Sequence, residues 1–184
     1  MNVVMRDTEL PLVYLQQGDL YCTGKHSVVT TVLGSCISVT MFYRRLGLSA
    51  ISHGFLPRCR NQQSCGDGCR DRGRYVDCSI RIMVGWFKQY HVHSGELEVG
   101  IYGGAEMFGV GYRGRATASV GKQNIDTAEK LLGDGGLQVL TKDVGGTQGR
   151  KIYFNTRDGC IHVQYLQPTV VMADTVGACR GPLR

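Results

Sequence analysis

Short segments rich in β-branched and aromatic residues recur along this chain, and turn-forming residues separate them. This pattern predicts short strands, because branched and aromatic side chains pack well on a pleated surface whereas Gly, Asp and Asn favour turns. The 26 glycines and only 4 prolines indicate tight turns rather than proline-rich linkers. Seven strands are predicted: Val28 to Leu33, Ser38 to Tyr43, Leu48 to His53, Leu97 to Tyr102, Leu137 to Thr141, Lys151 to Asn155 and Ile161 to Leu166. Arg157-Asp158-Gly159 predicts a hairpin between the last two.

Two further segments carry apolar residues at steps of three and four, which is the spacing of one helix face. Their members are Val76, Ile80, Met83, Val84 and Phe87 in the first segment and Ile125, Ala128, Leu131 and Leu132 in the second. Asn124 is a candidate N-cap of the second helix, and Gly135 or Gly136 can end it. Strands interrupted by two helices predict an α+β or layered α/β sandwich with mixed, mostly antiparallel strands, rather than a doubly wound parallel sheet.

Composition is that of a soluble globular protein, with 42% hydrophobic and 20% charged residues, and 184 residues suit one domain spanning 1–184. The first twenty residues include Arg6, Asp7, Glu9 and Asp19 and lack the apolar core of a secretory signal. No apolar stretch approaches the roughly 20 residues that span a bilayer. We therefore expect a cytoplasmic protein without membrane insertion, whose eight cysteines are reduced.

The net charge of +6 raises the question of a nucleic-acid partner. Arg and Lys are spread over the chain apart from an Arg-rich stretch at 58–74, and no aromatic residues alternate with them there. This distribution favours a basic surface suited to an acidic protein partner over nucleic-acid binding.

Cys36 is a candidate nucleophile because it follows a strand-like apolar run and a Gly34-Ser35 bend. A thiol acts in catalysis when a base can ionise it and when backbone N–H groups can hold the charge on the attacked carbonyl. If a helix starts at the bend, its first N–H groups would lower the thiol pKa. A Cys within an apolar run is also typical of a small core residue, and the residues alone leave both interpretations open.

His53 is a candidate base, because it ends the predicted strand that begins at Leu48 and a loop follows it. A histidine satisfied by a hydrogen bond at a sheet edge is the alternative. The other four histidines have no comparable setting.

Gly109-Val110-Gly111-Tyr112-Arg113-Gly114 matches the GxGxxG pattern of dinucleotide-binding sites. That site requires a strand directly before the motif and a helix that opens on its third Gly. The predicted helix starts too late, so we interpret the match as a chance one.

Cys59, Cys65, Cys69 and Cys78 lie in or beside one polar, Gly-rich loop. Four thiols can hold a structural zinc, yet no CxxC pair is present. The alternative is a loop whose thiols are incidental, and the sequence leaves the question open.

Several blocks, taken in order along residues 15 to 166, resemble the chemoreceptor glutamine deamidase family, CheD. They are Thr30 to Cys36, Ser52 to Pro57, Tyr75 to Asp77, Tyr102 to Phe108, Val120 to Asn124 and Asp143 to Arg150. Residues 167–184 form a C-terminal tail that matches nothing recognisable, and the Cys- and Arg-rich loop departs from the family pattern.

The resemblance implies a hydrolase that converts glutamine side chains of methyl-accepting chemotaxis receptors to glutamate and releases ammonia. The family's catalytic residues fall on Cys36, His53 and Thr30, with Thr30 expected to orient the imidazole. The implied fold is similar to the catalytic domain of the cytotoxic necrotizing factors, and a CheC-type phosphatase is the implied partner. We expect the backbone at Ser35 and Cys36 to form the oxyanion site, and we expect no metal or organic cofactor.

Two other function classes stay open. A cysteine peptidase or transglutaminase would use the same Cys/His pair. A chemotaxis adaptor stabilised by zinc would keep the fold without catalysis.

Overall fold

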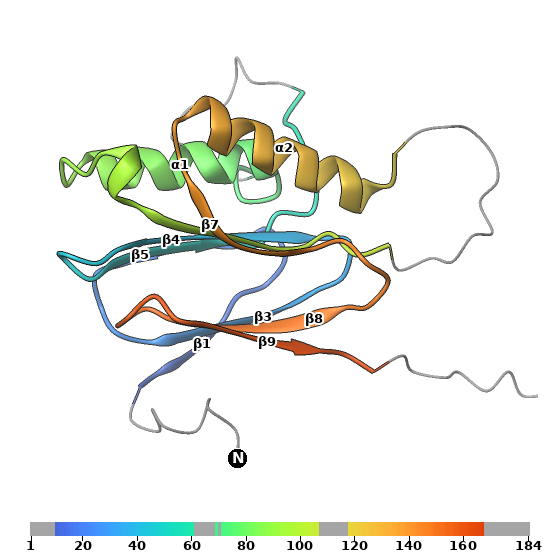
Figure 1. Ribbon diagram of the computed structural model, residues 1–184, viewed down its shortest axis with the longest axis horizontal. Helices are drawn as coiled ribbons and strands as arrows, with labels where there is room; N and C mark the ends of the chain where they lie inside the picture. The colour runs from blue at the N-terminus through green and yellow to red at the C-terminus, as the bar shows by residue number, and fades with distance from the viewer. Residues whose placement is uncertain (1–9, 61–68, 70, 107–117, 168–184) are drawn as a thin grey trace, which may run out of the picture.

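The computed structural model describes residues 10–60, 69, 71–106 and 118–167. Its described part is built in three layers, with two helices, a central sheet and an outer sheet stacked in that order (Figure 1). This confirms the predicted layered α+β architecture. No described helix is long and apolar enough to span a membrane.

The central sheet has five strands in the order β2-β5-β4-β6-β7. The strands are β2 (Leu20–Thr23), β4 (Ile37–Tyr43), β5 (Leu48–Ser52), β6 (Glu98–Gly103) and β7 (Val139–Val144). All neighbours are antiparallel except β6 and β7. Because β4 lies in the middle of this order, it has hydrogen-bonded neighbours on both edges, and its side chains are covered by the helices on one face and by the outer sheet on the other.

The outer sheet has four strands in the order β1-β3-β8-β9. The strands are β1 (Leu12–Tyr14), β3 (Val28–Leu33), β8 (Arg150–Asn155) and β9 (Ile161–Tyr165). Only β1 and β3 pair in parallel, and β8 and β9 form the predicted hairpin. The chain passes from the outer sheet to the central sheet between β3 and β4, and Cys36 lies in that connection.

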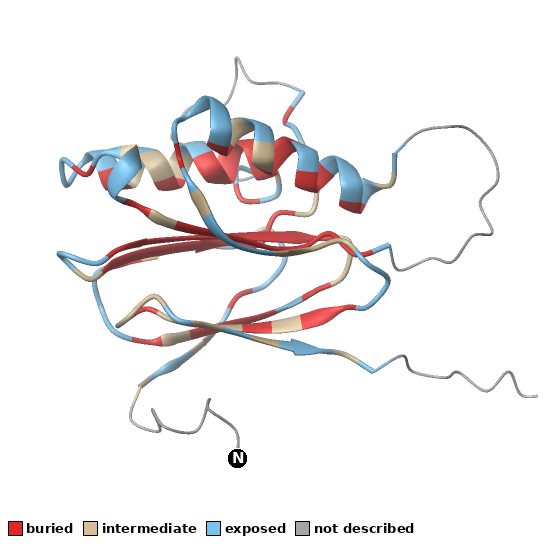
Figure 2. Cartoon of the chain, in the orientation of Figure 1, coloured by how far each residue is buried: buried red, intermediate tan, exposed pale blue. Residues whose placement is uncertain are grey.

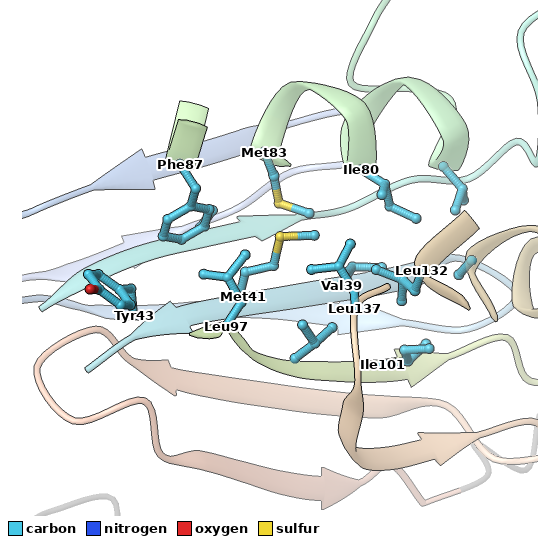
Figure 3. Packing of buried hydrophobic residues seen from close by; sticks show 14 of the residues in the cluster. Val39, Met41, Tyr43, Ile80, Met83, Phe87, Leu97, Ile101, Leu132 and Leu137 are labelled. Carbon is cyan, nitrogen blue, oxygen red and sulfur yellow. The ribbon is translucent and has the colours of Figure 1, made fainter. Parts of the chain in front are cut away.

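Helices α1 (Val76–Lys88) and α2 (Val120–Asp134) cover one face of the central sheet, and a short 3₁₀ turn (Ser94–Glu96) precedes β6 (Figure 1). Met83 and Phe87 of α1 and Leu132 of α2 are buried against Val39 and Met41 of β4 (Figure 3). This apolar layer explains the predicted helical spacing, since each helix turns its periodic residues toward the sheet.

Every residue of β4 and β5 is buried (Figure 2). Along β4, the side chains of Ile37, Val39 and Met41 join the cluster under the helices, whereas Phe42, and Cys36 just before the strand, join the cluster against the outer sheet. A strand with both faces covered carries no simple apolar and polar alternation, but its period of two still decides which layer each side chain enters.

All seven predicted strands and both helices are present, with ends that differ by a few residues. The strands β1 and β2 were not predicted, because three and four residues are too few to carry a clear alternation. No helix starts after the Gly34-Ser35 bend, because β4 follows Cys36 directly.

The proposed cap at Asn124 is wrong. Helix α2 begins at Val120, and the Ser119 hydroxyl caps it by accepting a hydrogen bond from the Lys122 N–H. Asn124 therefore lies inside the helix, with a side chain that is free to serve another purpose. The predicted end at Gly135 agrees with the observed C-cap.

Candidate active site

Cys36 lies on the face of the central sheet that is covered by the outer sheet. Ile37 and Gly54 form a bridge in which each N–H donates to the carbonyl of the other residue. The same register pairs Thr40 with Ile51 further along β4 and β5.

Continuing this register places His53 opposite Ser38, and therefore one diagonal step from Cys36 on the same sheet face. Diagonal neighbours of an antiparallel pair lie about 7–8 Å apart at their backbones, within reach of long side chains. The structure thus brings together the two residues that the sequence proposes as nucleophile and base. Both are buried, with exposed fractions of 6% for Cys36 and 3% for His53.

Thr31 of the outer sheet holds the imidazole of His53. Its Oγ1 lies 2.7 Å from His53 Nδ1 and also 2.7 Å from the carbonyl oxygen of Leu15. A hydroxyl has one proton, and a carbonyl oxygen can only accept, so Thr31 donates to Leu15 and accepts from Nδ1–H. This assignment puts the imidazole proton on Nδ1 and leaves the Nε2 lone pair available.

Nε2 of His53 is buried and has no hydrogen-bond partner within the part of the chain that the structure describes. A buried, unpaired acceptor is costly in a site that serves stability alone. The nitrogen that Thr31 leaves free is thus the one that can take a proton.

The contact expected from Thr30 is made by Thr31 instead. Successive side chains of a strand point to opposite faces, and Val29 and Leu33 of β3 belong to the cluster between the sheets. Thr31 shares their face, whereas Thr30 points the other way, and its Oγ1 has no hydrogen-bond partner among the described residues. Moving the assignment by one position along β3 therefore changes the sheet face, and only Thr31 is on the face that contacts the imidazole.

The strand alternation itself could have identified Thr31. Val29, Thr31 and Leu33 lie at steps of two, so a strand that buries its apolar residues also turns Thr31 inward. Spacing from Cys36 alone does not distinguish the two threonines.

Three donors hold the carbonyl groups of the Cys36 loop. Ala105 N–H donates to the Gly34 oxygen at 2.8 Å, and Gly104 N–H donates to the Cys36 oxygen at 2.7 Å. Between them, Asn124 Nδ2 donates to the Ser35 oxygen at 3.1 Å. The conformation of the loop is therefore imposed by the end of β6 and by α2.

Gly103 permits this close approach. Its φ is +107°, and a Cβ there would overlap the carbonyl oxygen of Cys36. Only glycine combines that backbone conformation with that contact.

The connection between β1 and β2 passes directly over the site. The Gly18 N–H donates to the His53 oxygen at 2.8 Å, and the His53 N–H donates to the Asp19 oxygen at 3.0 Å. The exposed side chain of Gln17 reaches inward from this connection, with Nε2 3.4 Å from the sulfur of Cys36. Sequence reasoning missed Gln17 because nothing in its local pattern links it to Cys36.

Burial sets the protonation states of the candidate pair. It raises the pKa of the Cys36 thiol above its ordinary value, and the hydrogen bonds from Gln17 and from the N–H of Cys36 itself act in the opposite direction. Burial also lowers the pKa of His53, against smaller raising effects of the Leu15 carbonyl and the Asp19 carboxylate. At neutral pH both groups are therefore uncharged in the free protein, a thiol beside a neutral imidazole.

Cys22 shows the effect of burial alone on the pKa of a thiol in this chain. Its pKa is raised to about 12, with burial as the cause. A thiol with that pKa carries almost no thiolate at neutral pH. Cys22 is therefore a matched, unreactive comparison for Cys36.

No group of three or more His, Cys, Asp or Glu side chains suited to a metal occurs in the described ranges. Cys59 and Cys78 are buried and Cys69 is half-buried, whereas Cys65 lies outside the described residues. The GxGxxG match at 109–114 and the tail at 168–184 also lie outside them.

The fold and the site define a class: layered α+β domains with a candidate thiol nucleophile and a histidine on one internal sheet face. A family model described as CheD chemotactic sensory transduction matches residues 55–165 of the chain. The chain belongs to the CheD family.

Curated relatives extend this similarity to the N-terminal half of the site. The chain is 42% identical over 168 residues to "Probable chemoreceptor glutamine deamidase CheD 2" of Geobacter sulfurreducens, covering 89% of this chain and 96% of the relative. It is 39% identical over 167 residues to "Probable chemoreceptor glutamine deamidase CheD" of Oleidesulfovibrio alaskensis, covering 88% of this chain and 76% of the relative. Since each alignment covers nearly nine tenths of the chain, its span extends over the positions of Cys36 and His53.

Proposed function

We propose that this protein deamidates glutamine side chains of methyl-accepting chemotaxis receptors, yielding glutamate and ammonia, with Cys36 as nucleophile and His53 as base. Membership of the CheD family and the names of its relatives support the substrate and reaction. The observation that carries the assignment of roles is the bond between Thr31 and His53 Nδ1, which leaves Nε2 unprotonated on the face that holds Cys36.

In the first step, His53 Nε2 takes the proton of the Cys36 thiol as the sulfur attacks the side-chain carbonyl carbon of the substrate. A C–S bond forms, and the carbonyl π electrons move to oxygen. The imidazolium then donates its proton to the amide nitrogen, the C–N bond breaks, and ammonia leaves behind a thioester. Proton transfer that accompanies the attack suits a pair that is uncharged at rest.

In the second step, His53 removes a proton from water, and the resulting hydroxide attacks the thioester carbonyl. The C–S bond breaks, glutamate is released, and the sulfur regains its proton from the imidazolium. Thr31 supports both steps because its oxygen accepts from Nδ1–H and so stabilises the imidazolium that forms each time.

The backbone N–H groups of Ser35 and Cys36 are the proposed oxyanion donors. Neither N–H donates a hydrogen bond to another residue within the described part of the chain. Both N–H groups adjoin the sulfur of Cys36 along the backbone, which suits donors to the oxygen of the attacked carbonyl.

The net charge of +6 suits an acidic protein substrate. Attraction between such surfaces speeds encounter and is screened by salt. We therefore expect kcat/KM to fall as ionic strength rises.

The direct test is to incubate the full chain with a purified cytoplasmic fragment of a chemoreceptor. Released ammonia and the mass of receptor peptides, which reports each conversion of Gln to Glu, are both measured. We expect Cys36→Ala to abolish both signals and Cys22→Ala, the matched control, to retain them. Peptide fragments or amine cross-links would instead indicate a peptidase or transglutaminase, and full activity of Cys36→Ala would refute the assignment.

A CheC-type phosphatase is the proposed regulatory partner, as the family resemblance implies. Mixing the two purified proteins and following their co-elution tests this proposal. Separate elution at concentrations above those in the cell would reject it.

A further inference from the structure

Asn124 is a buried amide that bridges the two halves of the candidate active site. Its exposed fraction is 0%, and it lies in the second turn of α2. Its Nδ2 donates to the carbonyl oxygen of Ser35 at 3.1 Å and to that of Phe55 at 3.3 Å. Ser35 directly precedes Cys36, and Phe55 follows His53 by two residues.

The bond to Ser35 determines the direction of the Cys36 N–H. The carbonyl of Ser35 and the N–H of Cys36 belong to one peptide group, and no cis peptide bond occurs among the described residues. In a planar trans peptide the C=O and N–H point to opposite sides. Fixing the oxygen on Asn124 therefore turns the Cys36 N–H away from α2.

The neighbouring peptide group is held in the same manner. The Ala105 N–H binds the Gly34 oxygen at 2.8 Å, which orients the N–H of Ser35. This anchor comes from backbone, whereas the anchor of the Cys36 N–H comes from a side chain that can be replaced.

We propose that Asn124 is a positioning residue for the oxyanion site: its amide aims the Cys36 N–H at the substrate oxygen and ties the Cys36 loop to the His53 loop. This inference rests on the proposed function, which it deepens. The donor half of the amide carries the role, because Oδ1 has no hydrogen-bond partner within the described residues.

Asn124→Asp is a sharp test because the shape is kept while the NH₂ donor becomes a carboxylate that faces two carbonyl oxygens. Asn124→Ala removes the group altogether. Thr127→Ala is the matched control, since Thr127 is another buried polar residue of α2, and none of its described hydrogen bonds reaches either loop. Thermal unfolding of each variant verifies that the chain is folded at the assay temperature.

Two reactions of Cys36 distinguish a role of Asn124 in positioning the oxyanion site from a role in keeping the Cys36 loop folded. Iodoacetamide alkylates the sulfur without forming an oxyanion, and peptide mapping by mass spectrometry reports Cys36 selectively. Butyraldehyde carries the carbon chain of a glutamine side chain with an aldehyde in place of the amide. The Cys36 thiol adds to the aldehyde carbonyl, and the hydroxyl group that forms occupies the oxyanion site. Bound butyraldehyde protects Cys36 from iodoacetamide, and this protection measures the affinity for butyraldehyde.

For Asn124→Asp and Asn124→Ala we expect kcat/KM for deamidation to fall about 10- to 100-fold, somewhat less than for outright removal of an oxyanion donor. Butyraldehyde affinity should fall roughly 3- to 10-fold, because its oxygen is uncharged. The alkylation rate should change less than about two-fold, which is small against these effects. Thr127→Ala should leave all three near wild type.

Equal losses in alkylation and turnover would overturn the proposal, because they would mean that Asn124 merely keeps the loop folded. Unchanged turnover and unchanged aldehyde affinity would overturn it as well. If the wild-type chain releases no ammonia, the proposed function fails, yet the ratio of aldehyde affinity to alkylation rate still tests the role of Asn124.

Discussion

The two faces of the central sheet differ in chemistry although the same strands supply both. On the helix side, Val39 and Met41 of β4 pack against Met83 and Phe87 in an apolar layer (Figure 3). On the other side, the interface with the outer sheet contains the hydroxyls of Ser38, Thr40 and Ser49 together with Thr31, Cys36 and His53, all buried.

This difference indicates that the two faces have different roles, one in stability and the other in chemistry. Buried apolar side chains stabilise the fold, whereas buried polar groups cost free energy unless they are hydrogen-bonded. The second face retains the unpaired Nε2 of His53 and the unpaired hydroxyl of Ser38, as far as the described residues show. Substitutions of the apolar residues on the helix face should therefore affect stability, and those of the polar residues on the second face should affect chemistry.

The largest effect should come from His53→Asn. The Asn amide can still donate to Thr31 from the position of Nδ1, but no base remains at Nε2. We expect kcat for ammonia release to fall by about 10³-fold or more, with an almost unchanged melting temperature. Substantial remaining turnover would show that another group acts as the base.

On the helix face, Met83→Ala should have the opposite effect to His53→Asn: it should lower stability and leave turnover unchanged. Met83 is fully buried between α1 and the sheet. Truncation leaves a cavity and should lower the free energy of unfolding by about 2–5 kcal/mol, as urea titration measures. The folded fraction should keep its turnover. Leu140→Ala, at an exposed residue of β7, is the control and should change the free energy of unfolding little. A large loss of turnover in folded Met83→Ala would contradict the proposed difference between the two faces.

The adjacent threonines of β3 sharpen the comparison within a single strand. Thr31→Val keeps the shape and removes the oxygen that accepts from His53 Nδ1–H. Since a hydrogen bond to a charged group contributes about 1.5–3 kcal/mol, turnover should fall about 10- to 100-fold. Thr30→Val should be nearly silent. The reverse order of effects would restore Thr30 to the role that the family spacing assigns to it.

The smallest effect concerns pH and stability. Burial depresses the pKa of His53 in the folded state, so the unfolded chain binds more protons between that value and the ordinary one of 6.5. The contribution of the neutral imidazole is complete above pH 6.5 and is lost as the pH falls through the folded pKa. The free energy of unfolding should thus decrease with acidification in this window, and less so in His53→Asn; parallel curves for the two chains would contradict the assignment.

Much of the site could be predicted because it depends on short motifs and local patterns. Strand β3, the bend at Gly34 and the strand end at His53 all follow from residue preferences within a few positions. Thr31 was missed because the family spacing was preferred to the strand alternation. Gln17 and Asn124 had no local signal, since their partners lie 19 and 89 residues away.

The layered α+β class, seven of the nine described strands and both helices follow from the sequence by itself, since propensity and periodicity act over a few residues, and the sequence also proposes Cys36 and His53 as candidates. Tertiary structure alone decided which imidazole nitrogen is free, how Gln17 reaches the sulfur of Cys36, and how Asn124 joins the two loops. These features depend on contacts across layers, where the register of a strand and the face of a helix are settled by the packing of distant segments.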